Sequence, residues 1–234
     1  MSGVPCDVQL LNLCAALLLL LSFAMLAQRR VVNLVNLLAM QGVLLLAATL
    51  LLAWRTGQQH LYLSALLTLA LKVLFLPWLL HRLIRQLKVY WDSDPLLNIP
   101  LTTLVGVVVV VFSFGLAQPI SALASTATRN CIGIALAVVL LSFLTMITRR
   151  KAMSQVVGFL SMENGLFFGA MSATYGMPMV VELGVALDVL VAVLVLGIFF
   201  FQIREQFDSL DLHHLEALRE RAPAGAAEPP QEEH

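Results

Sequence analysis

Three ionisable residues lie deep inside long apolar stretches of this sequence, where a charge is costly. Lys72, Glu163 and Asp188 lie about twelve, eleven and nine residues into such stretches. At about 1.5 Å per residue, each is near the middle of a bilayer about 30 Å thick. A charge at that depth costs about 2.5–3.5 kcal/mol on insertion scales. Because a carboxyl and an amine in a low-dielectric site can both change charge near neutral pH, these residues predict proton transfer.

Glu182 extends this candidate set toward the membrane surface. It lies about one turn from the end of its apolar stretch, so it can reach water and serve as an entry or exit group. The alternative is that the embedded charges only pair with one another and hold helices together. Buried ion pairs are weak evidence for stability, since apolar residues of similar volume often stabilise as well. The relay is therefore the favoured interpretation.

The composition of the 234-residue chain is that of an integral membrane protein. Apolar residues make up 60% and charged residues 12%, against about 25% charged in soluble domains, and mean hydropathy is +0.90. Uninterrupted apolar runs lack the alternation of a β-barrel, which leaves helices as the spanning elements. We predict an all-α membrane protein with seven transmembrane helices at residues 8–27, 31–54, 60–84, 101–121, 130–148, 152–174 and 179–203.

The basic residues of the predicted loops set the orientation. Arg55 and Arg129 fall on one side of the membrane, whereas eleven fall on the other: Arg29, Arg30, Arg82, Arg85, Lys88, Arg149, Arg150, Lys151, Arg204, Arg219 and Arg221. Because cytoplasmic loops carry the excess of Lys and Arg, the N-terminus is predicted outside and the C-terminus in the cytoplasm.

Three segments outside the spans have different predicted roles. Residues 89–100 carry two aromatic residues among acids and prolines, which is typical of an interfacial segment. Residues 204–220 predict an amphipathic cytoplasmic helix, which either docks on a soluble partner or lies on the headgroups. Residues 221–234 are rich in Ala, Pro and Glu and predict a disordered tail.

Several function classes are excluded by charge and cysteine usage. The formal net charge is +0, so there is no basic surface for nucleic acid. Cys6, Cys14 and Cys131 are far apart and show no ligand spacing. We therefore predict no metal site, no bound cofactor and no catalytic residue in this chain; lipid is an expected partner.

The sixth span is predicted to use two faces. Ser161, Gly165 and Gly169 recur every four residues, a spacing of small side chains that lets helices approach closely. Glu163 is two residues from both Ser161 and Gly165, about 200° around the helix. The helix is therefore expected to pack on one face and present the carboxylate on the other.

Spans one to three resemble spans five to seven. Residues 31–42 and 153–164 align without a gap, which matches Gln41 with Glu163. Lys72 then corresponds to Asp188, with a longer loop. The fold predicted from this is two parallel repeats, about 8–84 and 130–203, joined by the linking helix 101–121 within a 1–203 membrane domain. Gln41 becomes a polar bridge between the halves.

The last third of the chain carries the motifs of a known family. Arg149-Arg150, VGFLSMENG (157–165), Asp188 and SLDLHHLEALR (209–219) resemble the K subunit of complex I and the C subunit of multisubunit sodium/proton antiporters. With KVLFLPWL (72–79), the chain over about residues 8–220 is similar to the hydrogenase-4 component E family. Against the complex I subunit, Glu163 lies one turn after the aligned glutamate.

The resemblance implies a non-catalytic membrane subunit of a complex-I-like oxidoreductase in the bacterial inner membrane. Its partners would be antiporter-like subunits and, through them, hydrogenase and iron–sulfur subunits that carry out the redox chemistry. The chain would contribute to proton or sodium translocation. Two alternatives stay open, a purely structural scaffold of such a membrane arm and a free-standing small ion transporter.

Overall fold

The computed structural model describes residues 6–57, 59–87, 98–121 and 129–174, with isolated residues 184, 186, 187, 189–191, 193, 194 and 197. Regular structure in these residues is helical. The elements are α1 (Cys6–Ala27), α2 (Val31–Thr56), α3 (Gln59–Thr68), the π-helix η1 (Leu69–Phe75), α4 (Leu76–Leu87), α5 (Ile99–Ser121), α6 (Arg129–Thr148) and α7 (Ala152–Thr174). The chain divides into two units, residues 1–192 and 193–234, and these helices all belong to the first.

Six helical segments in the described part of the chain are long and apolar enough to cross a membrane, because α3, η1 and α4 follow one another without a break and form one segment. This confirms the first six predicted helices, with boundaries that differ by a few residues. The predicted seventh span, 179–203, falls largely outside the described residues, as do 204–220 and 221–234. The two-repeat arrangement stays a prediction.

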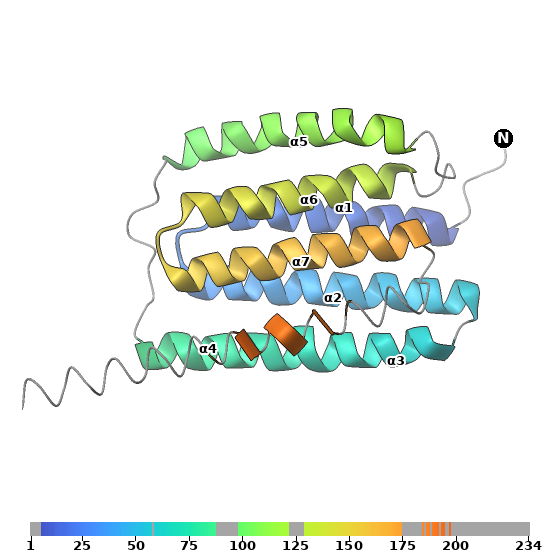
Figure 1. Ribbon diagram of the computed structural model, residues 1–234, viewed down its shortest axis with the longest axis horizontal. Helices are drawn as coiled ribbons and strands as arrows, with labels where there is room; N and C mark the ends of the chain where they lie inside the picture. The colour runs from blue at the N-terminus through green and yellow to red at the C-terminus, as the bar shows by residue number, and fades with distance from the viewer. Residues whose placement is uncertain are drawn as a thin grey trace, which may run out of the picture. The chain divides into compact units, whose positions relative to one another are not determined.

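Helices α1, α2, α6 and α7 lie between α5 on one side and the α3–η1–α4 span on the other (Figure 1). Helix α6 packs against α7, α5 and α1, whereas α2 packs against α1, α7 and the α3–η1–α4 span. The apolar core joins α1, α2, α6 and α7 and includes Leu18, Leu45, Ala135, Phe168 and Met171. Helix α5 packs mainly on α6, and only 17% of its apolar stretch is buried. Its outward face is apolar, as expected of a helix that faces lipid.

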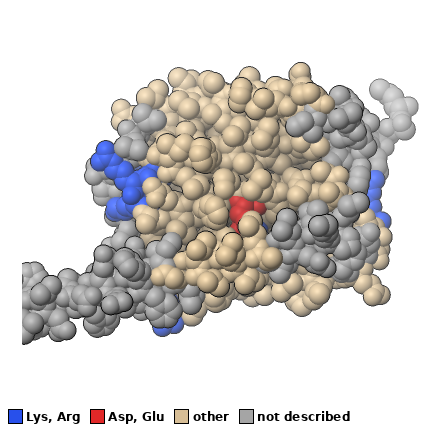
Figure 2. All heavy atoms as spheres, in the orientation of Figure 1, with Lys and Arg blue, Asp and Glu red and all other residues tan. Residues whose placement is uncertain are grey.

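Charge is concentrated where the helices end. We call one end of the first unit the basic end, defined by Arg29, Arg30, Arg82, Arg85, Arg149, Arg150 and Lys151. Figure 2 shows basic atoms at the two ends of one face, with uncharged residues over most of the length between them and acidic atoms near the middle. This distribution fits a protein whose apolar middle crosses a membrane.

One cation of the basic end is structural. Arg149 is buried and donates hydrogen bonds from Nη2 to the main-chain oxygens of Met25, Leu26 and Gln28. These carbonyls belong to the last turn of α1 and the residue after it, where a helix leaves acceptors unpaired. Arg149 therefore caps α1 from the loop between α6 and α7, a role that its place among the loop cations did not predict.

Candidate functional site

An ion pair lies in the middle of the membrane span. The Nζ atom of Lys72 is 3.0 Å from Oε1 of Glu163, and their side chains are 3% and 2% exposed. Lys72 belongs to η1 and Glu163 to α7, so the pair joins residues 91 positions apart. A buried pair in hydrocarbon keeps each charge compensated, whereas either one alone would be costly.

Lys72 lies in a π-helix that directly precedes a proline turn. The main-chain N–H of Leu76 bonds the carbonyl of Leu71, five residues earlier, at the end of this segment. Pro77 follows at once; it has no N–H to donate to Val73 and its ring would crowd that carbonyl. The wider π turn before the proline makes room for its ring and does not need the missing N–H. Single π turns are frequent at functional sites.

Gly42 of α2 lets the π-helix come close. A Cβ at this position would lie 3.3 Å from the main-chain oxygen of Lys72 and 3.4 Å from Cγ2 of Val73. The neighbouring atom on the Lys72 side is backbone, which cannot move aside as a side chain can. A glycine here therefore fixes the separation of α2 from the segment that carries the lysine.

Lys72 has a second polar partner and an aromatic one. Its Nζ donates to Oδ1 of Asn164 at 3.1 Å and lies 5.0 Å from the centroid of the Phe167 ring. A cation over an aromatic face is stabilised by the ring quadrupole, and more so when desolvated. Phe167 also touches Gly184, where an added Cβ would come within 2.5 Å of the ring. The aromatic ring thus lies between the lysine and Gly184.

A line of hydrogen bonds continues from Asn164 to α1. Asn164 Nδ2 donates to Oε1 of Gln41 at 3.4 Å, and Gln41 Nε2 donates to Oγ of Ser22 at 3.0 Å. The Ser22 hydroxyl donates to the carbonyl of Leu18 at 3.0 Å. Four spans, α1, α2, the α3–η1–α4 span and α7, are therefore connected by one polar network through the apolar core.

The hydrogen bonds from Asn164 to Gln41, Ser22 and Leu18 all run in one direction, with each donor group on the side away from Lys72. The carbonyl ends of both amides face the ammonium and their NH₂ ends face α1, so their dipoles align in favour of a positive charge on the lysine. Amide groups accept and donate but do not titrate. Within the described residues, the groups of the network that can exchange a proton are therefore the Lys72 amine and the Glu163 carboxyl.

The opposite face of α7 is packed without charge. The hydroxyl oxygens of Ser161 and Ser142 are 2.8 Å apart. A Cβ on Gly165 would lie 2.9 Å from Val138 Cγ1, and one on Gly169 would lie 2.9 Å from the Ala135 Cβ. These contacts are all with α6. The predicted two faces of this helix are confirmed.

The chain is similar in sequence to known proteins. A Mycobacterium tuberculosis protein, "Uncharacterized protein Rv0085", is 36% identical over 212 residues, which cover 90% of this chain and 96% of the relative. The chain belongs to the Rv0085 family. "Hydrogenase-4 component E" of Escherichia coli is 27% identical over 175 residues, covering 75% of this chain and 76% of that protein. No family model matches, and no solved structure matches significantly.

In this member of the Rv0085 family, three of the five predicted site residues come together. Lys72 and Glu163 are in direct contact and Gln41 joins them through Asn164. Asp188 and Glu182 lie outside the described residues.

Sequence reasoning missed two members of the network in this Rv0085 family protein. Asn164 directly follows Glu163 in an apolar span, and an amide in hydrocarbon is a signal that could have found it. Ser22 gave no such signal, because serine in a span often bonds the carbonyl one turn back in its own helix. Its bond to Leu18 is of that kind, and only its contact with Gln41 distinguishes it.

Proposed function

We propose that the protein is a membrane-arm subunit of a hydrogenase-4-type, complex-I-like assembly and contributes to proton or sodium translocation. The similarity to Hydrogenase-4 component E and the six apolar spans support this. Redox chemistry would be carried out by hydrogenase and iron–sulfur subunits, reached through antiporter-like subunits. This chain itself would be non-catalytic.

The buried Lys72–Glu163 pair carries the proposal. Two charges at mid-bilayer are expensive, and an apolar pair of similar volume would often stabilise the helices as well. Charged residues that are kept in a membrane span despite this cost typically line ion pathways. Glu163 would take and release the proton, while Lys72 is its charge partner or the next group in the relay. Gln41, through Asn164, bridges the pair to α1 and holds the lysine in place.

Two acidic residues would extend the pathway beyond the pair. Asp188 is proposed as a second carrier and Glu182 as the entry or exit group. The lysine and arginine residues of the basic end support a bacterial inner-membrane orientation in which that end is cytoplasmic. The N-terminus would then be outside and the C-terminus in the cytoplasm.

A structural scaffold is the second candidate, and the direction of the hydrogen bonds favours it. The line from Lys72 ends on the backbone carbonyl of Leu18, so it anchors a charge and offers no exit for a proton. If the ion pair likewise exchanges no proton, the role of the protein is to hold other subunits together. The two candidates differ in whether the charges themselves are needed.

The deciding experiment replaces both charged residues by neutral glutamine, Lys72→Gln with Glu163→Gln; the amide is isosteric with the glutamate and shorter than the lysine. Because no buried charge is left unpaired, assembly should be retained in the double variant. Ion-gradient formation, measured by dye quenching in inverted vesicles, should be lost if the pair is the relay. Undiminished quenching with intact assembly would establish the scaffold instead.

Thr49→Val is the matched control for this experiment. It removes a buried hydroxyl that bonds the Leu45 carbonyl and the Met171 sulfur, without touching a charge. Ion-gradient formation, measured by dye quenching, and assembly should both be the same as in the unmodified protein.

Mild-detergent purification of the chain with mass spectrometry tests the assembly. Antiporter-like subunits together with nickel–iron and iron–sulfur subunits are expected. If redox subunits are found without a nickel–iron subunit, the assignment as a membrane-arm subunit would stand and the assignment to a hydrogenase would be wrong. A chain that purifies alone would leave the free-standing transporter.

A further inference from the structure

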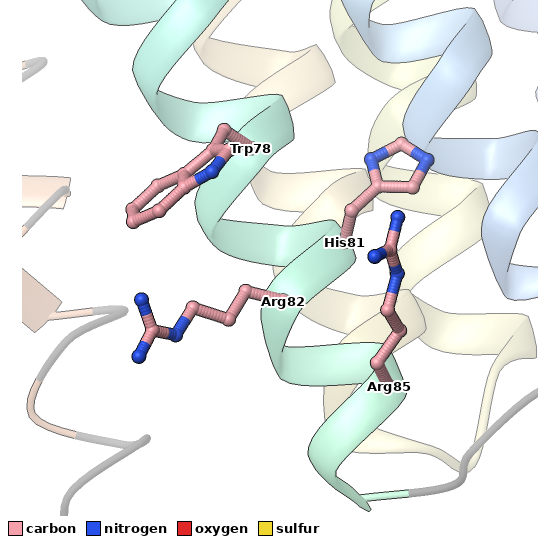
Figure 3. Close-up of a pocket in the computed structure, with 4 residues that line it drawn as sticks. All are labelled: Trp78, His81, Arg82 and Arg85. Carbon is pink, nitrogen blue, oxygen red and sulfur yellow. The ribbon is translucent and has the colours of Figure 1, made fainter.

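The last turns of α4 carry a basic face that the ion pathway does not use. Trp78, His81, Arg82 and Arg85 line a cavity of about 280 Å³. Their spacing of three and four residues brings the side chains to neighbouring positions on the helix surface. Figure 3 shows Arg82 extending beside Trp78, and Arg85 extending along the helix toward His81.

This face changes character with depth. Leu74 and Trp78, one turn apart, are 62% and 56% exposed, and Arg82 follows one turn later and is also exposed. Arg85 is the last residue of the membrane span. Toward the basic end the surface therefore passes from aliphatic to aromatic to cationic. That is the order in which a phospholipid presents acyl chain, glycerol and phosphate, and tryptophan favours the level between them.

The cationic groups of this face are available to an anion. The guanidinium of Arg82 lies 5.4 Å from the Trp78 ring centroid, and a guanidinium held against an aromatic ring keeps its N–H fork for a phosphate. Arg85 forms no hydrogen bond or ion pair with the residues that the structure describes. His81 Nδ1 is 2.8 Å from the Pro77 carbonyl, so that nitrogen donates and the ring is fixed as a wall of the cavity.

We propose that this face binds the phosphate of an anionic phospholipid in the leaflet at the basic end. An acidic protein segment would match the two arginines, but it would leave the exposed Leu74 and Trp78 surface unmatched. A lipid with a net negative headgroup matches both parts. The site does not depend on the ion-transfer proposal, since none of its residues belongs to the Lys72 network.

The test measures lipid retention by native mass spectrometry of the full chain, in the assembly in which it is isolated. Nanodiscs contain equal phosphatidylglycerol and phosphatidylcholine, and the protein is then extracted in mild detergent. The variant Arg82→Gln/Arg85→Gln is compared with Arg29→Gln/Arg150→Gln, which removes two exposed cations of the same end that do not line the cavity. A further variant, Arg82→Lys, keeps the charge and loses the stacked fork.

The parent and the Arg29/Arg150 control should retain phosphatidylglycerol in preference to phosphatidylcholine. The cavity variant should lose this preference by about 10- to 30-fold, as expected for two cations near a membrane surface, and Arg82→Lys should lose part of it. An equal loss in the control would overturn the site, since it would reflect only net charge. Equal retention of both lipids, or release of phosphatidylglycerol by millimolar inorganic phosphate, would overturn a lipid-headgroup site as well.

Discussion

Helix α7 presents two faces of opposite chemistry. Toward α6 it offers Gly165 and Gly169, whose missing side chains let the two backbones approach. Toward η1 it offers Glu163 and Asn164, which bind the Lys72 ammonium. The first contact is made by small, uncharged side chains, whereas the second holds an ion pair at mid-membrane depth.

The difference indicates how one helix can combine stability with charge. Close packing of small residues supplies dispersion contacts, which drive helix association in lipid where the hydrophobic effect between helices is absent. The α6 contact can thus hold α7 in place while its other face carries groups that are costly to bury. The two faces should respond differently to mutation: substitutions on the α6 face should change stability alone, whereas substitutions of the ion pair should change ion transfer as well as stability.

The largest loss of stability is expected when the ion pair is broken on one side. Lys72→Ala leaves the Glu163 carboxylate buried opposite an empty position, which should lower the free energy of unfolding by about 3–5 kcal/mol. Chemical unfolding in mixed micelles measures it.

The double variant Lys72→Ala/Glu163→Gln is the control for this prediction. It removes the stranded charge and should recover most of the loss. A double variant as unstable as the single one would show that lost packing, and not the unpaired charge, is responsible.

Loss of the α1 cap should have the next largest effect. Arg149→Ala removes donors from three main-chain carbonyls around the end of α1, and a hydrogen bond to a charged group contributes about 1.5–3 kcal/mol. We expect a destabilisation of about 2–3 kcal/mol by thermal unfolding in detergent.

Arg150 supplies the matched comparison, because it is adjacent and exposed. Arg150→Ala should stay within about 0.5 kcal/mol of the parent. Equal effects of the two substitutions would contradict a capping role for Arg149 and point to a general effect of charge at this end.

The α6 contact itself is tested by adding one methyl group. In Gly165→Ala the new Cβ would lie 3.2 Å from the main-chain nitrogen of Val139 and 2.9 Å from Val138 Cγ1. Because the Val139 backbone cannot move aside, this overpacking should lower the free energy of unfolding by about 1–3 kcal/mol. Gly115→Ala in α5 has open space around the same atom and should be neutral or slightly stabilising. Ion transfer per folded molecule should be unchanged in both variants.

The two faces also differ in how far the sequence could predict them. The contact with α6 was predictable, since the spacing of Ser161, Gly165 and Gly169 is a local feature of one helix. The partner of Glu163 was not, because pairing depends on how spans far apart in sequence pack. The alignment of the two halves made Lys72 and Asp188 equivalent positions, which says nothing about contacts, and the sequence did not say which acid Lys72 would contact; the fold brings Lys72 to Glu163.

The π-helix is a similar case. Pro77 predicts a kink in any helix, but the geometry that relieves the proline depends on the neighbouring helix. Here α2 approaches the backbone of Lys72 through Gly42, a contact that no local pattern encodes. Helix ends and lengths were predictable for the opposite reason, because the bilayer thickness fixes the span length and polar residues mark the limits.

The smallest effect is expected at the far end of the polar line. Ser22→Ala removes the hydroxyl that accepts from Gln41 and leaves the ion pair, Asn164 and the α6 contact in place. One neutral hydrogen bond contributes about 0.5–1.5 kcal/mol, so unfolding in mixed micelles should shift by that amount. Because the line ends on a backbone carbonyl, ion-gradient formation should persist in this variant. A complete loss of dye quenching with intact assembly would instead make the Ser22 hydroxyl part of the pathway and reverse the assignment of the amide line as an anchor.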